Sequence, residues 1–436
     1  MNFAAQAFQL AEKSKSILLF DAIKNSEARF AAGVPDSLLS REQNLRSEIA
    51  YYQDQLYQEN RKAESSDSLM AQYRKQVFDR TDGLNKLVKQ FETAFPSYYN
   101  LKYSSDNISL SEVQKKLAGT NSQLVEYFVG ESSIFIIAIT ADEIKLNQVA
   151  KDAALDSILA QVLESVHGEQ VFEANVFASA SFALYEHILA PLIDPSKERL
   201  IIIPDGQLGY LPFETLLTAS QNAGTPPAYL IQSHALHYAY SAQLLYRAPN
   251  PHNQKAPKLN WLGYAPNYQG TEVLPYNQEE VKNIARLFEG EARYGEAASL
   301  ADFMAIGTNA RFLHLSMHGY PNEDNPMYSY LAFAGDSLNR LHAYQIFDLQ
   351  LNSELVVLSA CKTAYGPLAQ GEGIMSLSRA FRYAGCPSIL TSLWSADGSV
   401  AKDLLADFYA GLQDGKAKDL ALREAKLNFL QSAPPN

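Results

Sequence analysis

The feature that most constrains the fold is an alternation of apolar strand-like runs with helix-like segments, which occurs twice after residue 118. The first series contains "QLVEYFV", "IFIIAIT" and "RLIIIP", and the second contains "LNWLGYAP", "ARFLHLS", "LNSELVVLSA" and "PSILTSLW". Such alternation is typical of an α/β layer with a largely parallel sheet. We therefore expect two adjacent α/β units, over residues 119–246 and 259–436, separated by a Pro- and Asn-rich linker near 247–258.

The residues before 119 have the helical period instead. Leu45, Ile49, Tyr52 and Leu56 are spaced by three and four, and similar spacing continues to residue 91. "SSDS" at 65–68 is typical of a turn between two antiparallel helices, and Pro96 is expected to close the last helix. The sequence thus predicts a helical, coiled-coil-like arm over residues 1–118, and no chemistry is expected there.

Composition excludes several classes of protein. Formal net charge is −12, from 36 basic and 48 acidic residues, which argues against direct nucleic-acid binding. Two cysteines cannot form a disulfide scaffold, and no Cys-x-x-Cys pair is present. The N-terminus lacks the features of a signal peptide, and no apolar run approaches the ~20 residues of a membrane span. We expect a soluble, cytoplasmic protein without a cofactor and without membrane association.

Two candidate catalytic residues follow two of the predicted strands. His318 lies just past "RFLHLS", directly before Gly319, and Cys361 lies just past "LVVLSA". Because parallel strands share one carboxyl edge, these side chains face each other if the strands are neighbours. An imidazole beside a thiol stabilises the thiolate and can protonate a leaving amine. The backbone N–H groups of Gly319 and Cys361 would then bind the oxyanion, although the pattern alone leaves a structural thiol open.

Other polar residues have simpler interpretations. His314 lies within the strand, where we expect a buried, hydrogen-bonded role, and His-x-x-x-His on a strand does not predict a metal site. Cys386 is expected to pack as a small apolar residue, and Tyr210 to lie in the core. Gly371 and Gly373 lack the Lys and Ser/Thr of a phosphate-binding loop and are expected to begin a helix beside the cysteine.

Three segments carry a resemblance to a known family. "FLHLSMHGY", "LVVLSACKTAYGPLAQGEGIMSLSRAFRYAGCPSILTSLWSADG" and "IIIPDGQLGYLPFETLL" resemble the CHAT family of caspase-like cysteine peptidases, relatives of separase and caspases. The resemblance covers roughly residues 119 to 430. It implies a caspase-like α-β-α sandwich, in which a degenerate first unit accompanies an active second unit behind the helical arm. It also implies His318 as general base and acid, and Cys361 as nucleophile.

The resemblance has implications for function as well. It implies a cysteine endopeptidase that cleaves a partner protein in bacterial antiviral defence or regulated cell death, such as a gasdermin or a CRISPR-associated protein. "AFQLAEKSKSILLFDAI" resembles the segment that follows tetratricopeptide repeats in relatives, so a regulatory partner on the arm is expected. The alternative is a non-catalytic interaction scaffold that retains the protease fold.

The residue before the cut would be bound beside the strand "SILTSLW". The expected pocket residues are Trp394, Ser395 and Asp397. Asp397 either points into this pocket and favours a basic residue, or caps the helix that follows. Relatives often carry a second acid where Gly398 stands, and they usually continue past residue 436 into a closing strand with a Trp. We therefore expect this sequence to be a piece of a longer protein.

Overall fold

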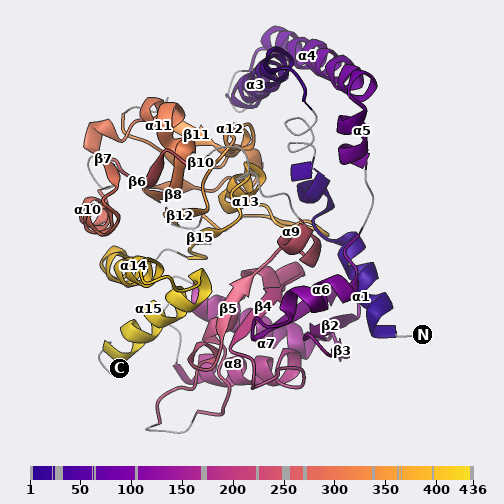
Figure 1. Cartoon of the computed structure of the whole chain (residues 1–436), viewed down its shortest axis with the longest axis vertical. Coiled ribbons are helices and arrows are strands. Elements are labelled where there is room, and N and C mark those ends of the chain that lie inside the picture. The colour runs from indigo at the N-terminus through magenta and orange to yellow at the C-terminus, as the bar shows by residue number, and fades with distance from the viewer. Residues whose placement is uncertain are drawn as a thin grey trace.

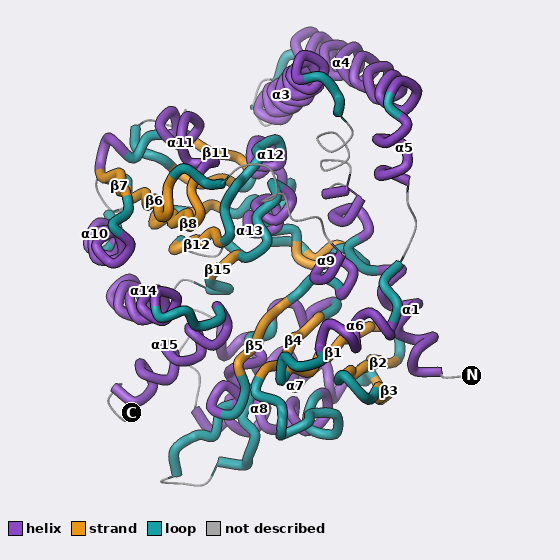
Figure 2. The backbone as a smooth tube through the Cα atoms, in the orientation of Figure 1, coloured by secondary structure: helices purple, strands orange, loops and turns teal. Residues whose placement is uncertain are grey.

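The computed structural model contains two five-stranded sheets, each with helices on both faces, and a helical hairpin (Figures 1 and 2). It describes residues 3–21, 23–24, 33–60, 62, 65–103, 107–167, 174–221, 225–247, 256–268, 273–335, 339–360, 363–364, 366–394 and 397–432. No helix within these ranges is long and apolar enough to cross a membrane.

The hairpin consists of α3 (Asp36–Asn60) and α4 (Asp67–Ala94), and it stands beside the second unit at the top of Figure 1. The Ser66 hydroxyl caps α4 by accepting from the Leu69 N–H, as the "SSDS" turn predicts. Buried Leu87 and Phe91 pack α4 against α3 and the start of α5. Pro96 ends α4 but does not close the helical region, because it begins α5 (Pro96–Tyr103).

The remaining helices before residue 119 pack elsewhere. α1 (Phe3–Ser14) and α6 (Leu110–Leu117) cover one face of the first sheet. Phe8 of α1 and Val113 of α6 are completely buried there against Leu124 and Ile137 of the sheet. The stretch that was expected to form one arm therefore divides between the hairpin and the core of the first unit.

The first sheet has the strand order β3-β2-β1-β4-β5. Its strands are β1 (Ser122–Val129), β2 (Ser133–Ile139), β3 (Ile144–Ala150), β4 (Arg199–Ile203) and β5 (Ala235–Tyr238). β1, β4 and β5 are parallel, whereas β2 pairs antiparallel with β1 and β3 pairs antiparallel with β2. α7 (Ala153–His167) and α8 (Ala174–Ile188) cover one face, and α9 (Ala242–Arg247) joins α1 and α6 on the other.

A buried charge cluster fixes α1 to this sheet. The Lys15 ammonium lies 3.2 Å from the Glu126 carboxylate on β1, and both side chains are almost fully buried. Glu12 accepts from the N–H groups of Ala242 and Gln243 at the start of α9. Burial and the neighbouring Glu12 raise the pKa of Glu126 to about 8, against the lowering effect of Lys15. Such a cluster is stable only while its cation remains in place.

The second sheet is entirely parallel, with the strand order β15-β12-β8-β6-β7. Its strands are β6 (Leu259–Ala265), β7 (Glu291–Tyr294), β8 (Ala310–Ser316), β12 (Leu355–Ser359) and β15 (Ile389–Thr391). One face packs on α11 (Leu300–Ile306) and α13 (Leu377–Tyr383). The other packs on α10 (Asn277–Phe288), α14 (Gly398–Gln413) and α15 (Lys418–Ser432).

Short elements lie around the carboxyl edge of this sheet. Between β8 and β12 the chain forms β9 (Gly319–Tyr320), β10 (Tyr330–Ala332), β11 (Arg340–His342) and α12 (Ala343–Phe347). β13 (Leu368–Ala369) and β14 (Gly373–Ile374) form a small hairpin after β12. α15 joins the two units, because the Asp419 carboxylate accepts from Nε and Nη2 of Arg199 on β4 at 2.6 and 2.8 Å.

Candidate active site

The site begins where β8 and β12 end. These strands are adjacent and parallel, and their last residues Ser316 and Ser359 are register partners. The predicted pairing of the two strands is therefore confirmed. His318 follows β8 by two residues, and Ala360 follows β12 directly. Cys361 lies outside the described residues, so its contact with His318 stays a prediction.

The backbone of His318 is held on both sides. Its carbonyl accepts from the Ala332 N–H at 3.0 Å, and its own N–H donates to the Tyr268 hydroxyl at 3.2 Å. The same hydroxyl donates to the Ala332 carbonyl at 2.5 Å. The Tyr268 ring also packs on the imidazole, with the ring centroids 4.5 Å apart. His318 is thus held by two hydrogen bonds of its backbone and by the contact of its ring with Tyr268.

Gly319 opens β9, where it pairs with Leu331 of β10. Residues along an antiparallel ladder alternate between hydrogen-bonded and non-hydrogen-bonded pairs. Since the bond from Ala332 to His318 marks the preceding pair as the bonded one, the Gly319 N–H points away from β10. This direction is compatible with the oxyanion role expected for Gly319, which stays a prediction.

The described residues on either side of Cys361 are bound to the end of β15. The Ala360 carbonyl accepts from the hydroxyls of Thr363 and Ser392, each at 3.2 Å. The hydroxyls of Thr363 and Thr391 lie 2.6 Å apart. These bonds connect the residues that follow β12 to the end of β15. Ala360 and Thr363, on either side of the candidate nucleophile, are therefore held in place.

His314 has the structural role that was expected. Its side chain is completely buried, with Nε2 2.8 Å from Glu280 Oε1 and Nδ1 3.1 Å from the Tyr409 hydroxyl. Both ring nitrogens therefore have partners within the core between β8, α10 and α14. Across the described ranges, no group of three His, Cys, Asp or Glu side chains is arranged to hold a metal ion.

Cys386 is also confirmed as a packing residue. It is completely buried in the core of the second unit, and its thiol lies 3.1 Å from the Ser388 carbonyl. Burial raises the pKa of the Cys386 thiol to about 12. A thiol with such a pKa is almost entirely protonated near neutral pH, so Cys386 should be unreactive.

An extended cleft of about 1880 Å³ lies between the two units and borders the exit of β12. Ala360, Trp394 and Asp397 line it from the second unit. The Trp394 ring meets the His167 ring of α7 edge to face, with centroids 6.0 Å apart. Ser395, the third expected pocket residue, lies outside the described residues.

Asp397 caps α14. Its Oδ1 accepts from the N–H groups of Ser399 and Val400 at 2.8 and 3.4 Å, and from the Ser399 hydroxyl at 2.5 Å. These bonds, the Ser399 hydroxyl foremost, lower the pKa of Asp397. All three use one carboxylate oxygen, so capping and a place in the cleft wall are compatible. The pocket role stays a prediction.

The loop after Cys361 differs from expectation. Gly371 and Gly373 do not begin a helix: they lie at the turn of the β13–β14 hairpin with φ of +74° and +80°, and α13 begins only at Leu377. The Gly371 carbonyl accepts from the Ser16 N–H at 2.6 Å. A Cβ at Gly371 would lie 2.8 Å from the Ser14 carbonyl oxygen. Glycine is needed here because of this close approach to the N-terminal segment.

Tyr210 is a residue whose role was missed from the sequence. It is half-buried instead of belonging to the core, and its hydroxyl donates to the Gly366 carbonyl at 2.6 Å. The first unit thus holds the loop that follows the candidate nucleophile. The role of Tyr268 was missed as well. The one signal in the sequence was that Tyr268 follows a predicted strand, which places it at the same sheet edge as His318.

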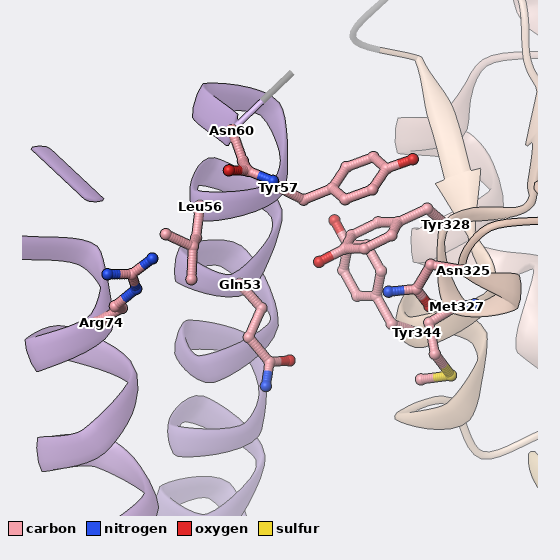
Figure 3. A pocket seen from close by; sticks show the side chains of 9 residues that line it. All are labelled: Gln53, Leu56, Tyr57, Asn60, Arg74, Asn325, Met327, Tyr328 and Tyr344. Atoms are coloured by element: carbon pink, nitrogen blue, oxygen red, sulfur yellow. Dashed lines mark hydrogen bonds between the residues drawn. The ribbon is translucent and has the colours of Figure 1, made fainter. Parts of the chain in front are cut away.

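The helical hairpin reaches the second unit at a separate cavity, shown in Figure 3. The Tyr57 ring of α3 stacks on the Tyr328 ring, with centroids 4.5 Å apart. Its hydroxyl accepts from the Asn322 side chain at 3.1 Å. Asn322 and Tyr328 lie between β9 and β10. They therefore belong to the same stretch between β8 and β12 that contains His318.

Comparison with known proteins agrees with this architecture. The CHAT domain model matches residues 179–436. The chain belongs to the CHAT-domain family, whose domain is a caspase-like peptidase fold. The chain is also 25% identical over 312 residues to tetratricopeptide repeat protein 28 of Homo sapiens, and equally to that of Mus musculus. These matches cover 58% of this chain, which spans only 12% of the length of each relative.

Proposed function

We propose that this protein is a cysteine endopeptidase in which Cys361 is the nucleophile and His318 the general base and acid. The observation that carries the proposal is the parallel pairing of β8 and β12, whose register partners Ser316 and Ser359 precede the two residues on neighbouring strands. The first unit acts in this proposal as the degenerate partner within a caspase-like α-β-α sandwich.

The chemistry proceeds in two stages. His318 takes the Cys361 proton, the thiolate attacks the peptide carbonyl carbon, and the N–H groups of Gly319 and Cys361 bind the resulting oxyanion. The C–N bond then breaks as His318 returns the proton to the leaving amine, which leaves a thioester. Water, deprotonated by His318, attacks the thioester, and the product acid leaves as the Cys361 thiolate is restored.

The substrate in this proposal is a partner protein, bound along the cleft between the units. Trp394, Ser395 and Asp397 form the wall beside the residue before the cut, and Asp397 Oδ2 favours Arg or Lys there. The resemblance to defence peptidases extends the proposal to a gasdermin or a CRISPR-associated protein as substrate, in the cytoplasm. A regulatory partner bound to the helical arm would control the access of the substrate to the cleft.

The test is cleavage of a fluorogenic peptide library with the residue before the cut varied. The wild-type protein should cleave a subset of peptides, and Cys361→Ala should cleave none. The thiol-to-methyl change removes the nucleophile with little loss of volume, so both proteins should melt at the same temperature. Undiminished turnover by Cys361→Ala would remove this residue from the mechanism.

The second candidate function is a non-catalytic interaction scaffold. It is favoured by the named relatives, which are tetratricopeptide repeat proteins, and by the docked hairpin. A scaffold would show no cleavage of any library peptide and no fast-reacting cysteine. The two candidates therefore differ in a single reactivity measurement.

A further inference from the structure

We propose that Tyr268 is a positioning residue for His318, acting by a hydroxyl inserted into the β9–β10 ladder. This inference rests on the proposed function, because it assigns a role toward the His318 of that site. It starts from the ladder pair His318 and Ala332, which lies directly before the Gly319 and Leu331 pair.

An ordinary pair of this kind exchanges two direct bonds between its N–H and C=O groups. Here only one direct bond is present, from the Ala332 N–H to the His318 carbonyl. The other position is taken by the Tyr268 hydroxyl, which accepts from the His318 N–H and donates to the Ala332 carbonyl. The hydroxyl thus bridges the two strands where their backbones would otherwise meet.

This insertion holds the two backbones apart on one side of His318 and leaves them in direct contact on the other. The backbone orientation at this residue, and with it the direction of the imidazole, then depends on one side-chain hydroxyl. The Tyr268 ring contact adds a second constraint on the imidazole itself. A base must lie within hydrogen-bond reach of its proton, so this orientation sets how well His318 meets the thiol.

The chain segments that lead into Tyr268 and His318 are connected by one buried side chain. The buried Asn277 side chain donates to the Pro266 carbonyl at 2.9 Å and to the Ser316 carbonyl at 3.4 Å. Pro266 precedes Tyr268 by two residues, and Ser316 precedes His318 by two residues. One amide therefore connects the segment after β6 to the segment after β8, and it keeps the hydroxyl in register with its target.

The matched pair for a test is Tyr268→Phe and Tyr264→Phe. The first keeps the aromatic ring and removes the bridging hydroxyl. The second, on β6 of the same sheet, removes a hydroxyl that donates to Asp302 at 2.8 Å, away from His318. Tyr268→Phe loses the two hydrogen bonds of its hydroxyl and Tyr264→Phe loses one, so a general loss of stability should affect both variants.

The probe is iodoacetamide, with the alkylation rate of Cys361 followed by peptide mass spectrometry and Cys386 as an unreactive internal reference. We expect Tyr268→Phe to slow alkylation of Cys361 about tenfold, since small misplacements at a reacting centre are costly. Tyr264→Phe should match the wild type, and His318→Ala should be slowest. With a cleavable library peptide, Tyr268→Phe should lower kcat and leave KM unchanged.

The outcomes separate this inference from the proposed function. If His318→Ala slows alkylation and Tyr268→Phe does not, the positioning role of Tyr268 is wrong and the dyad stands. Equal slowing in Tyr268→Phe and Tyr264→Phe would also overturn it, because the effect would then be general. An alkylation rate unchanged in His318→Ala would instead contradict the proposed function.

Discussion

The carboxyl edges of the two sheets differ in how their polar groups are used. In the first sheet, the chain leaves β4 through Pro204 into Asp205, whose carboxylate accepts from the N–H groups of Val129 and Gly206 at 2.7 and 2.9 Å. In the second sheet, the same edge carries His318 after β8, and β12 runs through Ala360 into Cys361. Both edges border the cleft, but the Asp205 carboxylate at the first edge is occupied by backbone N–H groups, whereas the second edge carries the two candidate catalytic residues.

The difference shows that similar α/β layers can serve different purposes in one chain. The first unit buries its charges in the Lys15 and Glu126 cluster and directs Tyr210 at the loop of the second unit. The second unit buries His314 but leaves His318 half-buried at the edge. We interpret the first unit as a support and the second as the reactive unit.

The largest expected effect tests the support. Lys15→Met leaves Glu126 buried without its cation, so at a pH above the Glu126 pKa of about 8, where this carboxyl is ionised, the free energy of unfolding should fall by about 3–5 kcal/mol. Chemical denaturation measures this change. In the double variant Lys15→Met/Glu126→Gln, most of the loss should be recovered, because the Glu126 charge is then removed together with its cation while Glu12 keeps its backbone N–H partners. A loss below about 1 kcal/mol in the single variant would show that α1 is not fixed by this cluster.

A smaller effect is expected where the units meet. Tyr210→Phe removes the hydrogen bond to the Gly366 carbonyl, so backbone amides of residues 366–376 should exchange faster with solvent. Peptide cleavage should slow about fivefold, since one such bond contributes roughly 1 kcal/mol. Tyr238→Phe is the control, because its hydroxyl bonds Phe213 and Glu214 within the first unit. Unchanged exchange in Tyr210→Phe would mean that the first unit does not support the loop.

The smallest effect concerns the specificity of the reactive unit. Asp397→Asn keeps an oxygen that can cap α14 and removes the negative charge, so the melting temperature should stay within about 1 °C. If Asp397 faces the bound peptide, preference for Arg or Lys over Leu should fall about threefold, as expected for a charge pair open to solvent. The peptide library measures this ratio. An unchanged ratio would leave Asp397 with the capping role alone.

Local patterns predicted the features that local physics determines. The alternation of strands and helices indicated both sheets, whereas the adjacency of β8 and β12 was a condition of the proposed dyad that the structure meets. The burial of His314 and Cys386 followed from their positions in apolar strands or beside them. These features depend on the periodicity of apolar residues, which can be read from a single sequence and indicates which side chains are buried.

Features that depend on contacts between distant segments were not predictable. Nothing near Phe8 or Val113 indicates that α1 and α6 pack on the first sheet, because their apolar faces fit a helical arm equally well. The turn at Gly371 is determined by the approach of Ser14 and Ser16 from the other end of the chain. Tyr268 meets His318 across the ends of two strands, where Asn277 binds the Pro266 and Ser316 carbonyls.

The central claim is that His318 activates Cys361, and the most direct measurement is covalent labelling by a peptidyl acyloxymethyl ketone, read by intact mass. The wild type should gain one adduct per chain, located at Cys361, while Cys361→Ala should gain none and His318→Ala should react at least tenfold more slowly. Labelling of His318→Ala at the wild-type rate, or an adduct at Cys386 instead, would contradict the account.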